Sequence, residues 1–242
     1  MKPEHTKNYS KFAQIYSHYM RKINYNVWSE YLSDFLLEYL SEDSTVLELA
    51  AGEGNLSLFL SKYFKHYYIS DLSIEMLKNC DWSNQKICCD MRALPFKKKF
   101  DLVLMVFDSI NYLLTKKDLL KVANQVSSVL NTGGIFTFDA SLEANSYEHI
   151  HPFTEEKKFK KIKYRHKSWY NEKQRIHYNE FQIIDSKNEI SLELHRQKIY
   201  KLEDYFEVFE KTDLYVIGCY DAFSYKEPKA KSLRAQFILR KG

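Results

Sequence analysis

Residues 45–57, TVLELAAGEGNLS, decide the fold. A short apolar run ends in the acid Glu48, Gly52 and Gly54 follow, and apolar residues then recur at helical spacing. A buried strand that turns sharply into a helix has this pattern, because glycine lets the backbone turn and brings its N–H groups close to a ligand. Taken alone, the loop fits an ordinary turn, a phosphate cradle or a pocket for another nucleotide-like cofactor.

Strand-like and helical patterns alternate from residue 46 to residue 139. This order predicts βαβ units, and therefore a parallel sheet with helices on both faces. From about 157 to 200 the pattern instead predicts strand after strand, joined by short turns. We therefore predict an α/β protein in three parts: a leader and cofactor-binding core (1–141), an antiparallel β insert (142–200) and a C-terminal part that completes the core sheet (201–242).

Composition limits the class of protein. The chain has 242 residues, of which 45% are hydrophobic and 28% charged, which is typical of a globular protein. Its net charge of +4 is too small to indicate nucleic-acid binding by itself. The N-terminus lacks a secretory pattern, and the longest apolar run, residues 102–107, is far shorter than a membrane span. We interpret Cys88 and Cys89 as core thiols, and we predict a cytoplasmic protein without membrane contact.

Three acids at predicted strand ends narrow the choice of ligand. Glu48 precedes the glycines, and Asp71 ends the second strand about 20 residues later, where an acid accepts hydrogen bonds from ribose hydroxyls. Asp90 ends the third strand beside Met91, a pair suited to holding an exocyclic amine and stacking on a purine. A carboxylate beside the glycines suits a cationic amine better than a phosphate. The acids therefore predict S-adenosylmethionine (SAM), with a nicotinamide dinucleotide as the weaker alternative.

The stretch VLELAAGEGN resembles the first motif of class I SAM-dependent methyltransferases, (D/E)-x-G-x-G-x-G. Glu48, Gly52 and Gly54 match the motif, while Ala50 stands where its first glycine is expected. The resemblance continues in FDLVLMVFDSINYL, in LNTGGIFTFD and in the late strand pair, so it covers nearly the whole chain. The leader YSKFAQIYSHYMRKINYNVW is similar to that of small bacterial methyltransferases with a β-rich insert, which are similar to sugar N-methyltransferases and, more distantly, to glycine N-methyltransferase.

This resemblance implies a Rossmann-like class I methyltransferase fold: a seven-stranded, mostly parallel sheet with a small antiparallel β insert after strand 5. It also implies SAM as cofactor and S-adenosylhomocysteine as product. The residues expected to bind the cofactor are Tyr16, Glu48, Ala50, Gly52, Gly54, Asp71, Leu72, Asp90, Met91 and Phe107. The resemblance implies a reaction and not an acceptor.

Methyl transfer from a sulfonium requires alignment and exclusion of water, and a general base only if the acceptor arrives protonated. Asp108 follows the fourth strand beside the expected methyl position, and His195 projects from the same strand face as Glu193 and Gln197. We take Asp108 and His195 as the candidate catalytic residues. The structural alternatives are a turn at Asp108, a solvated or hydrogen-bonded face around His195, and simple helical packing for Tyr16.

The basic run KKFKKIKYRHK at 157–167 leaves two interpretations open. It suits an RNA backbone, but we favour an edge strand with a lysine-protected outer face. Glu193, His195 and His177 have the right atom types for a metal but no diagnostic spacing, so no metal is predicted.

The sequence therefore predicts a SAM-dependent methyltransferase that acts on an N or O atom of a small-molecule acceptor. An RNA, particularly tRNA, methyltransferase and a SAM-binding sensor without turnover are the alternatives. A monomer and a homodimer are equally compatible with the sequence.

Overall fold

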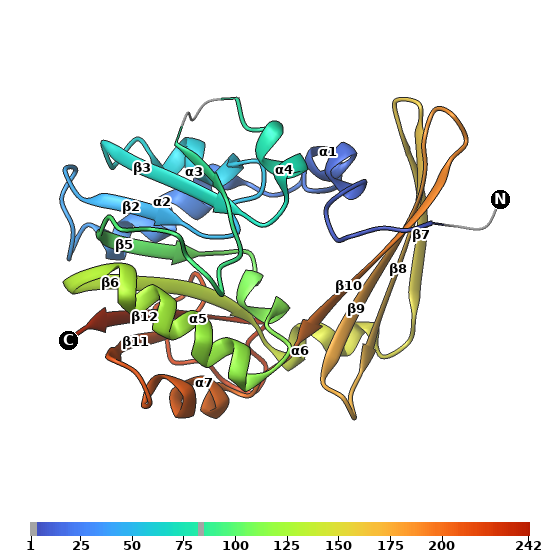
Figure 1. The fold of residues 1–242 in the computed structure, drawn as a ribbon. Coiled ribbons are helices and arrows are strands. Elements are labelled where there is room, and N and C mark those ends of the chain that lie inside the picture. Colours follow the sequence, from blue (N-terminus) through green and yellow to red (C-terminus); the bar gives the residue numbers. More distant parts are fainter. Residues whose placement is uncertain (1–3, 82–84) are drawn as a thin grey trace.

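The computed structural model describes residues 4–81 and 85–242, whose strands form two sheets (Figure 1). In the core sheet, five strands run parallel in the order β6-β5-β2-β3-β4, β12 pairs antiparallel with β6, and β11 pairs antiparallel with β12. This confirms the predicted seven-stranded, mostly parallel sheet. Its strands are β2 (Thr45–Glu48), β3 (His66–Asp71), β4 (Lys86–Cys88), β5 (Phe100–Met105), β6 (Leu130–Ser141), β11 (Leu214–Asp221) and β12 (Arg234–Lys241).

Helices cover both faces of the core sheet, and polar side chains fix where several of them begin. The helices α5 and α7 pack on one face, and α2 and α3 pack on the other. The side chains of Asn24, Ser73 and Thr115 accept hydrogen bonds from the first turns of α2, α4 and α5, which satisfies N–H groups that the helix cannot pair itself. The bounds are α2 (Tyr25–Leu36), α3 (Asn55–Leu60), α4 (Ile74–Lys78), α5 (Lys116–Val129) and α7 (Leu202–Phe209).

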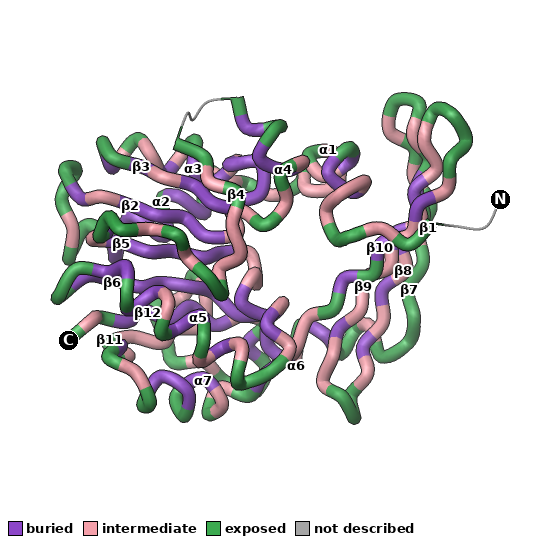
Figure 2. The backbone as a smooth tube through the Cα atoms, in the orientation of Figure 1, coloured by how far each residue is buried: buried purple, intermediate pink, exposed green. Residues whose placement is uncertain are grey.

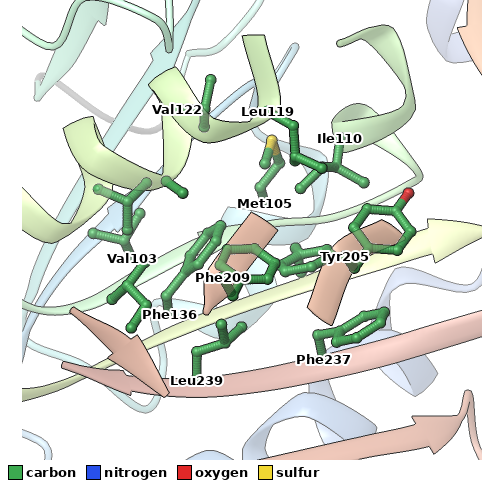
Figure 3. Close-up of a cluster of buried hydrophobic side chains, with 14 of the residues drawn as sticks. Val103, Met105, Ile110, Leu119, Val122, Phe136, Tyr205, Phe209, Phe237 and Leu239 are labelled. Atoms are coloured by element: carbon green, nitrogen blue, oxygen red, sulfur yellow. The ribbon is translucent and has the colours of Figure 1, made fainter. Parts of the chain in front are cut away.

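A cluster of buried aliphatic and aromatic side chains fills the space between the core sheet and α5 and α7 (Figure 3). Phe138 and Phe237 stack across β6 and β12 with ring centroids 4.8 Å apart, and Tyr205 and Phe209 of α7 pack against them. Strands that are buried on both faces have continuous apolar runs in their sequence, which is why β5 shows no alternation of apolar and polar residues. Figure 2 shows these strands buried along most of their length.

The insert sheet has the order β1-β10-β9-β8-β7 and lies beside the carboxyl ends of the core strands (Figure 1). All its pairs are antiparallel except the short β1, which pairs parallel with β10. Its strands are β1 (Glu4–His5), β7 (Phe153–Phe159), β8 (Ile162–Asn171), β9 (Ile176–Ile184) and β10 (Ile190–Lys198). The short elements around it are η1 (Phe12–Gln14), α1 (Tyr16–Tyr19), η2 (Ser109–Tyr112), α6 (Glu143–Ser146) and η3 (Tyr147–His149).

The structure corrects three details of the sequence interpretation. The basic run 157–167 is not one edge strand: a turn with Lys160 at φ 54° divides it between β7 and β8, and β8 is an inner strand. The side chain of Cys88 is exposed, so its interpretation as a core thiol was wrong. The apolar spacing of residues 28–40 predicts a buried helical face that includes Tyr39, but helix α2 ends at Leu36 and leaves Tyr39 exposed. Within the described residues, no helix combines the length and the apolar character that crossing a membrane requires.

Candidate active site

A cavity of about 870 Å³ lies where the core, the leader and the insert sheet meet. The volume lies within the range of small-molecule and cofactor sites. Residues of all three parts line it, which places the carboxyl ends of the parallel strands opposite the inner face of the insert sheet. From the core these include Glu48, Gly52, Asp71, Met91 and Asp108; from the leader, Tyr9, Phe12, Tyr16 and Tyr19; from the insert, Asn179, Phe181, His195 and Gln197.

The glycine loop forms a cradle at the floor of this cavity. Gly52 has φ +60°, and a Cβ atom there would lie 3.0 Å from Met76 Cε and 3.8 Å from Tyr16 Oη, so a side chain would fill the cradle. Gly54, at φ 70°, is the N-cap of α3. Ala50 has φ 52°, so the first position of the loop does adopt the left-handed backbone that glycine prefers, at a cost of about 1 kcal/mol for alanine.

Glu48 is buried at the end of β2, and both of its hydrogen-bond donors use the same oxygen. Ser57 Oγ and Tyr67 Oη donate to Glu48 Oε2 at 2.5 and 2.6 Å. Burial raises the pKa of Glu48 to about 7, because the loss of hydration outweighs the two hydrogen bonds that favour the carboxylate. A cationic group beside Glu48 would restore the charged form, so the residue is suited to an ammonium ligand.

Asp71 connects β3 to the glycine loop. The backbone N–H of Gly52 donates to Asp71 Oδ2 at 2.8 Å, and that of Ser73 donates to Oδ1 at 2.7 Å. Burial raises the pKa of Asp71, although these hydrogen bonds oppose the shift. Each carboxylate oxygen keeps a second lone pair, so Asp71 has the capacity to accept two hydroxyl donors as well.

Asp90 at the end of the third predicted strand forms an ion pair with Arg92, whose Nη2 lies 2.7 Å from Oδ2. The hydrogen bonds from Arg92 hold the pKa of Asp90 below its ordinary value, so this acid is ionised. Asp90 and Met91 both line the cavity.

A family model described as a methyltransferase domain matches residues 46–134. The Bacillus subtilis protein YqeM, described as a candidate methyltransferase, is 28% identical over 246 residues, which cover 96% of this chain and 97% of YqeM. A solved SAM-dependent methyltransferase from Clostridium acetobutylicum is 27% identical, with a TM-score of 0.80 and coverage of 97% of this chain and 99% of that one. These findings support a class I SAM-dependent methyltransferase. The sugar N-methyltransferase KedS8 from Streptoalloteichus shares the fold at 16% identity, with a TM-score of 0.76 over 93% of this chain and 90% of KedS8.

The cavity of this methyltransferase fits its cofactor. Three features support the fit: an open cradle at Gly52, a buried carboxyl at Glu48 that a cation would ionise, and the acid Asp71 beside the loop. All ten residues predicted to bind the cofactor except Gly54 line the cavity, and Gly54 instead begins α3. Contact between these residues and the cofactor stays a prediction.

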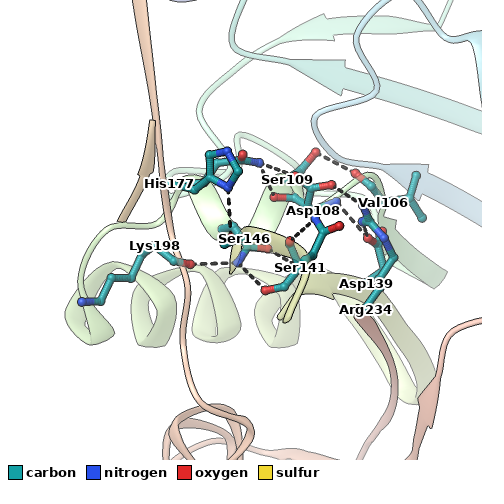
Figure 4. A network of polar contacts seen from close by, with 12 residues as sticks. Val106, Asp108, Ser109, Asp139, Ser141, Ser146, His177, Lys198 and Arg234 are labelled. Carbon is teal, nitrogen blue, oxygen red and sulfur yellow. Dashed lines mark hydrogen bonds and ion pairs between the residues drawn. The ribbon is translucent and has the colours of Figure 1, made fainter. Parts of the chain in front are cut away.

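Asp108 lies in a network of paired charges that the sequence did not reveal (Figure 4). Phe107 and Asp108 both adopt left-handed backbone conformations, at φ 55° and 50°. Arg234 of β12 donates to Asp108 Oδ1 at 2.7 Å and also to Asp139, and Gln197 donates to Asp108 Oδ2. Both carboxylate oxygens of Asp108 are therefore engaged, which leaves the residue better suited to holding the loop than to accepting a proton.

His195 belongs to a chain of hydrogen-bonding groups that starts in the cavity. Tyr9 Oη and Tyr112 Oη are 2.6 Å apart, and Tyr112 Oη is 3.0 Å from His195 Nδ1. The other ring nitrogen, Nε2, is buried without a hydrogen-bond partner and lies 3.4 Å from Glu193 Oε2. The nearby carboxylate favours the proton on Nε2, so Nδ1 accepts from Tyr112, and Tyr112 in turn accepts from Tyr9.

Glu193 also fastens the leader to the insert sheet. Its fully buried carboxylate accepts hydrogen bonds from the backbone N–H groups of Tyr9, Lys11 and Phe12 at 2.7, 2.6 and 3.0 Å. Burial raises the pKa of Glu193, but the His195 ring and the backbone donors outweigh it and hold the pKa below its ordinary value. The leader over the cavity is thus tied to an ionised group of β10.

The structure places Glu193, His195 and Gln197 on one face of β10, as their alternation predicts, and turns that face inward. His177 lies apart from them: Ser146 and Ser168 contact its two ring nitrogens at 3.0 and 2.8 Å. Within residues 4–81 and 85–242, no group of three or more His, Cys, Asp or Glu side chains could hold a metal ion.

Proposed function

We propose that this methyltransferase methylates a nitrogen atom of a small amine, which binds in the cavity under a lid formed by the leader and the insert sheet. The observation that carries this proposal is the chain from Tyr9 through Tyr112 to His195, with Glu193 behind it. An amine arrives mostly as an ammonium ion at neutral pH, and it must lose a proton before its nitrogen has a free electron pair. The chain supplies a route for that proton.

Each group in the chain passes on one proton. The ammonium donates to the oxygen of Tyr9 while Tyr9 gives its own proton to Tyr112 and Tyr112 gives its proton to His195 Nδ1. The ionised Glu193 stabilises the imidazolium that results. The neutral amine then attacks the methyl carbon: the N–C bond forms, the C–S bond breaks, and its electron pair stays on sulfur.

SAM supplies a methyl group activated by its positively charged sulfur. In our proposal Glu48 binds its ammonium group, Asp71 its ribose hydroxyls, and Asp90 with Met91 its adenine. Tyr16, whose hydroxyl lies near the glycine cradle, covers it from the leader. These residues hold and orient the cofactor and take no part in proton transfer.

The acceptor side of the cavity suits a cation. Four aromatic side chains of the leader and the insert line it, and aromatic faces attract cations and exclude water. These are Tyr9, Phe12, Tyr19 and Phe181. The sugar N-methyltransferase KedS8, which shares the fold, also supports nitrogen as the acceptor atom. Because Arg234 and Gln197 engage Asp108, we assign Asp108 a positioning role and His195 the role of terminal proton acceptor.

RNA as the methyl acceptor is less well supported, because the cations of β8 lie on the side of the sheet that faces away from the cavity. A sensor without turnover would bind SAM tightly and transfer no methyl group to any extract. Both alternatives are tested by the same assay.

The test uses labelled SAM and a small-molecule extract in two forms, one untreated and one acetylated with an amine-selective reagent. Label transferred to the untreated extract and absent from the acetylated one supports an amine acceptor. Equal transfer to both extracts would show an oxygen or carbon acceptor. Transfer only to an RNA fraction, or no transfer with intact SAM binding, would also contradict the proposal.

A further inference from the structure

The insert sheet has an outer face that is turned away from the cavity. Buried side chains of β8 face the leader, and the residues between them point outward: Lys163, Arg165, Lys167 and Trp169. The strand register extends this face across β7, β9 and β10. Figure 1 shows the leader and the core on one side of the sheet and, in the described part of the chain, no helix on the other.

The outer face is strongly basic. It carries six cations and two carboxylates, and its net charge of +4 equals that of the whole chain. The cations are Lys158, Lys163, Arg165, Lys167, Arg196 and Lys198, and the acids are Glu156 and Glu180. Within the described ranges 4–81 and 85–242, none of these six cations lies within ion-pair distance of a carboxylate. Their charge is therefore available to a partner.

A recess and an aromatic pair accompany these charges. A hollow of about 370 Å³ is lined by Lys158, Lys163 and Arg165, together with the acid Glu156. Further along the face, Trp169 and Tyr178 stack with ring centroids 5.0 Å apart and an interplanar angle of 4°. Lys167 Nζ lies 5.2 Å from the centre of the Trp169 ring. Proteins bind single-stranded nucleic acids with two features, a row of cations and aromatic rings on which bases stack. The outer face has both, since its cations follow one strand beside half-exposed aromatic rings.

We propose that the outer face binds single-stranded nucleic acid, with its phosphates on the row of cations and its bases against Trp169 and Tyr178. Alternate residues of a strand lie about 6.7 Å apart, so Lys163, Arg165 and Lys167 present regularly spaced charges to an extended backbone. This binding surface is separate from the cavity, and it does not depend on which acceptor the enzyme methylates.

Two other partners fit the face less well. A second copy would bring two surfaces of charge +4 together, and like charges oppose a symmetric interface. An anionic bilayer would meet the cations, but the recess is concave. Among the large exposed hydrophobic residues of the described chain, Leu194, at 36% exposure, is the one aliphatic side chain on this face. Phosphates and planar bases match both the charges and the rings.

The experiment measures fluorescence anisotropy of a labelled single-stranded RNA of about 20 nucleotides at low and moderate salt. Lys163→Glu/Arg165→Glu/Lys167→Glu is expected to weaken binding at least tenfold, and the salt dependence becomes shallower because fewer counterions are released. Trp169→Ala is expected to weaken binding roughly tenfold through lost stacking. The matched control, Lys97→Glu/Lys98→Glu/Lys99→Glu, makes the same change of charge on a core loop and is expected to leave binding within about twofold of the wild type.

Titration with S-adenosylhomocysteine shows that each variant is folded. Absence of RNA binding by the wild type at low salt would overturn the proposal. Equal losses in the two triple variants would also overturn it, because they would show a general effect of charge. Binding to phosphatidylserine vesicles but not to RNA would identify a membrane surface instead, and a dimer that dissociates in the outer-face variant would identify a contact between two copies.

Discussion

The core sheet and the insert sheet differ in what they bury. The core buries apolar side chains on both faces, and its buried acids lie at the carboxyl ends of the strands, as Glu48 does. The insert buries polar groups along its inner face, including His166, His177, Glu193 and His195. In our proposal, the comparison assigns the core the role of a stable cradle for the cofactor and the insert the role of supplying hydrogen-bonding groups to the acceptor side.

The largest expected effect is on the attachment of the leader. Glu193→Ala leaves the backbone N–H groups of Tyr9, Lys11 and Phe12 without their acceptor, and we expect the free energy of unfolding to fall by about 3 kcal/mol. Urea denaturation measures the loss, and limited proteolysis shows whether the leader is released first. Glu193→Gln keeps one acceptor oxygen and is expected to lose less; equal losses in both variants would contradict this role.

The next effect is on methyl transfer. Tyr112→Phe removes the hydroxyl that joins Tyr9 to His195, and we expect transfer to the small-molecule extract to fall about a hundredfold. The loss is expected to shrink as pH rises and the amine deprotonates without help. Tyr215→Phe, at an exposed site on β11, is the control. A loss in Tyr112→Phe that is the same at every pH would argue against proton transfer.

The insert is expected to lose stability in acid. Burial lowers the pKa of His177 to about 4, from an ordinary value of 6.5, so the unfolded chain binds more protons between these values. Lowering the pH from 6.5 to 4 is therefore expected to remove about 2 kcal/mol of stability. Urea titrations of the wild type and His177→Gln across this range measure the slope. An equally steep slope in both proteins would show that His177 is not its source.

Acid is also expected to weaken cofactor binding, through Glu48. Its pKa of about 7 keeps it largely protonated below neutrality, whereas an ammonium ligand binds the carboxylate. Affinity for S-adenosylhomocysteine is therefore expected to rise roughly tenfold from pH 6 to pH 8 and then level off. Calorimetric titration of Glu48→Gln is expected to show weaker binding with a flatter pH profile. An unchanged profile would place the ammonium elsewhere.

The smallest effect is at the unusual position of the glycine loop. Ala50→Gly relieves the left-handed strain at φ 52° but adds freedom to the unfolded chain, so stability is expected to rise by less than about 1 kcal/mol. Thermal unfolding measures the change. A clear loss of stability would show that the Ala50 methyl group makes contacts worth more than the strain.

The sequence was sufficient to predict the core sheet, because the patterns that identify its strands and their ends are local in the chain. The run before Glu48, the glycines and the acid Asp71 each lie at a strand end, and parallel strands bring such ends together. The partnership of Asp108 with Arg234 could not be predicted, because 126 residues separate them and the antiparallel β12 brings them together. In β10 the alternation predicted that Glu193, His195 and Gln197 share one face, but it left open whether that face is solvated or faces the cavity; the structure buries Glu193 and His195 and exposes Leu194.

The separation between the cofactor cradle and the proton-transfer chain is tested most directly by isothermal titration of S-adenosylhomocysteine into Asp71→Ala and Tyr112→Phe. Asp71→Ala removes the acid that ties β3 to the glycine loop, so its affinity is expected to fall at least tenfold. Tyr112→Phe is expected to bind like the wild type. Wild-type affinity in Asp71→Ala, or an equal loss in Tyr112→Phe, would contradict the account.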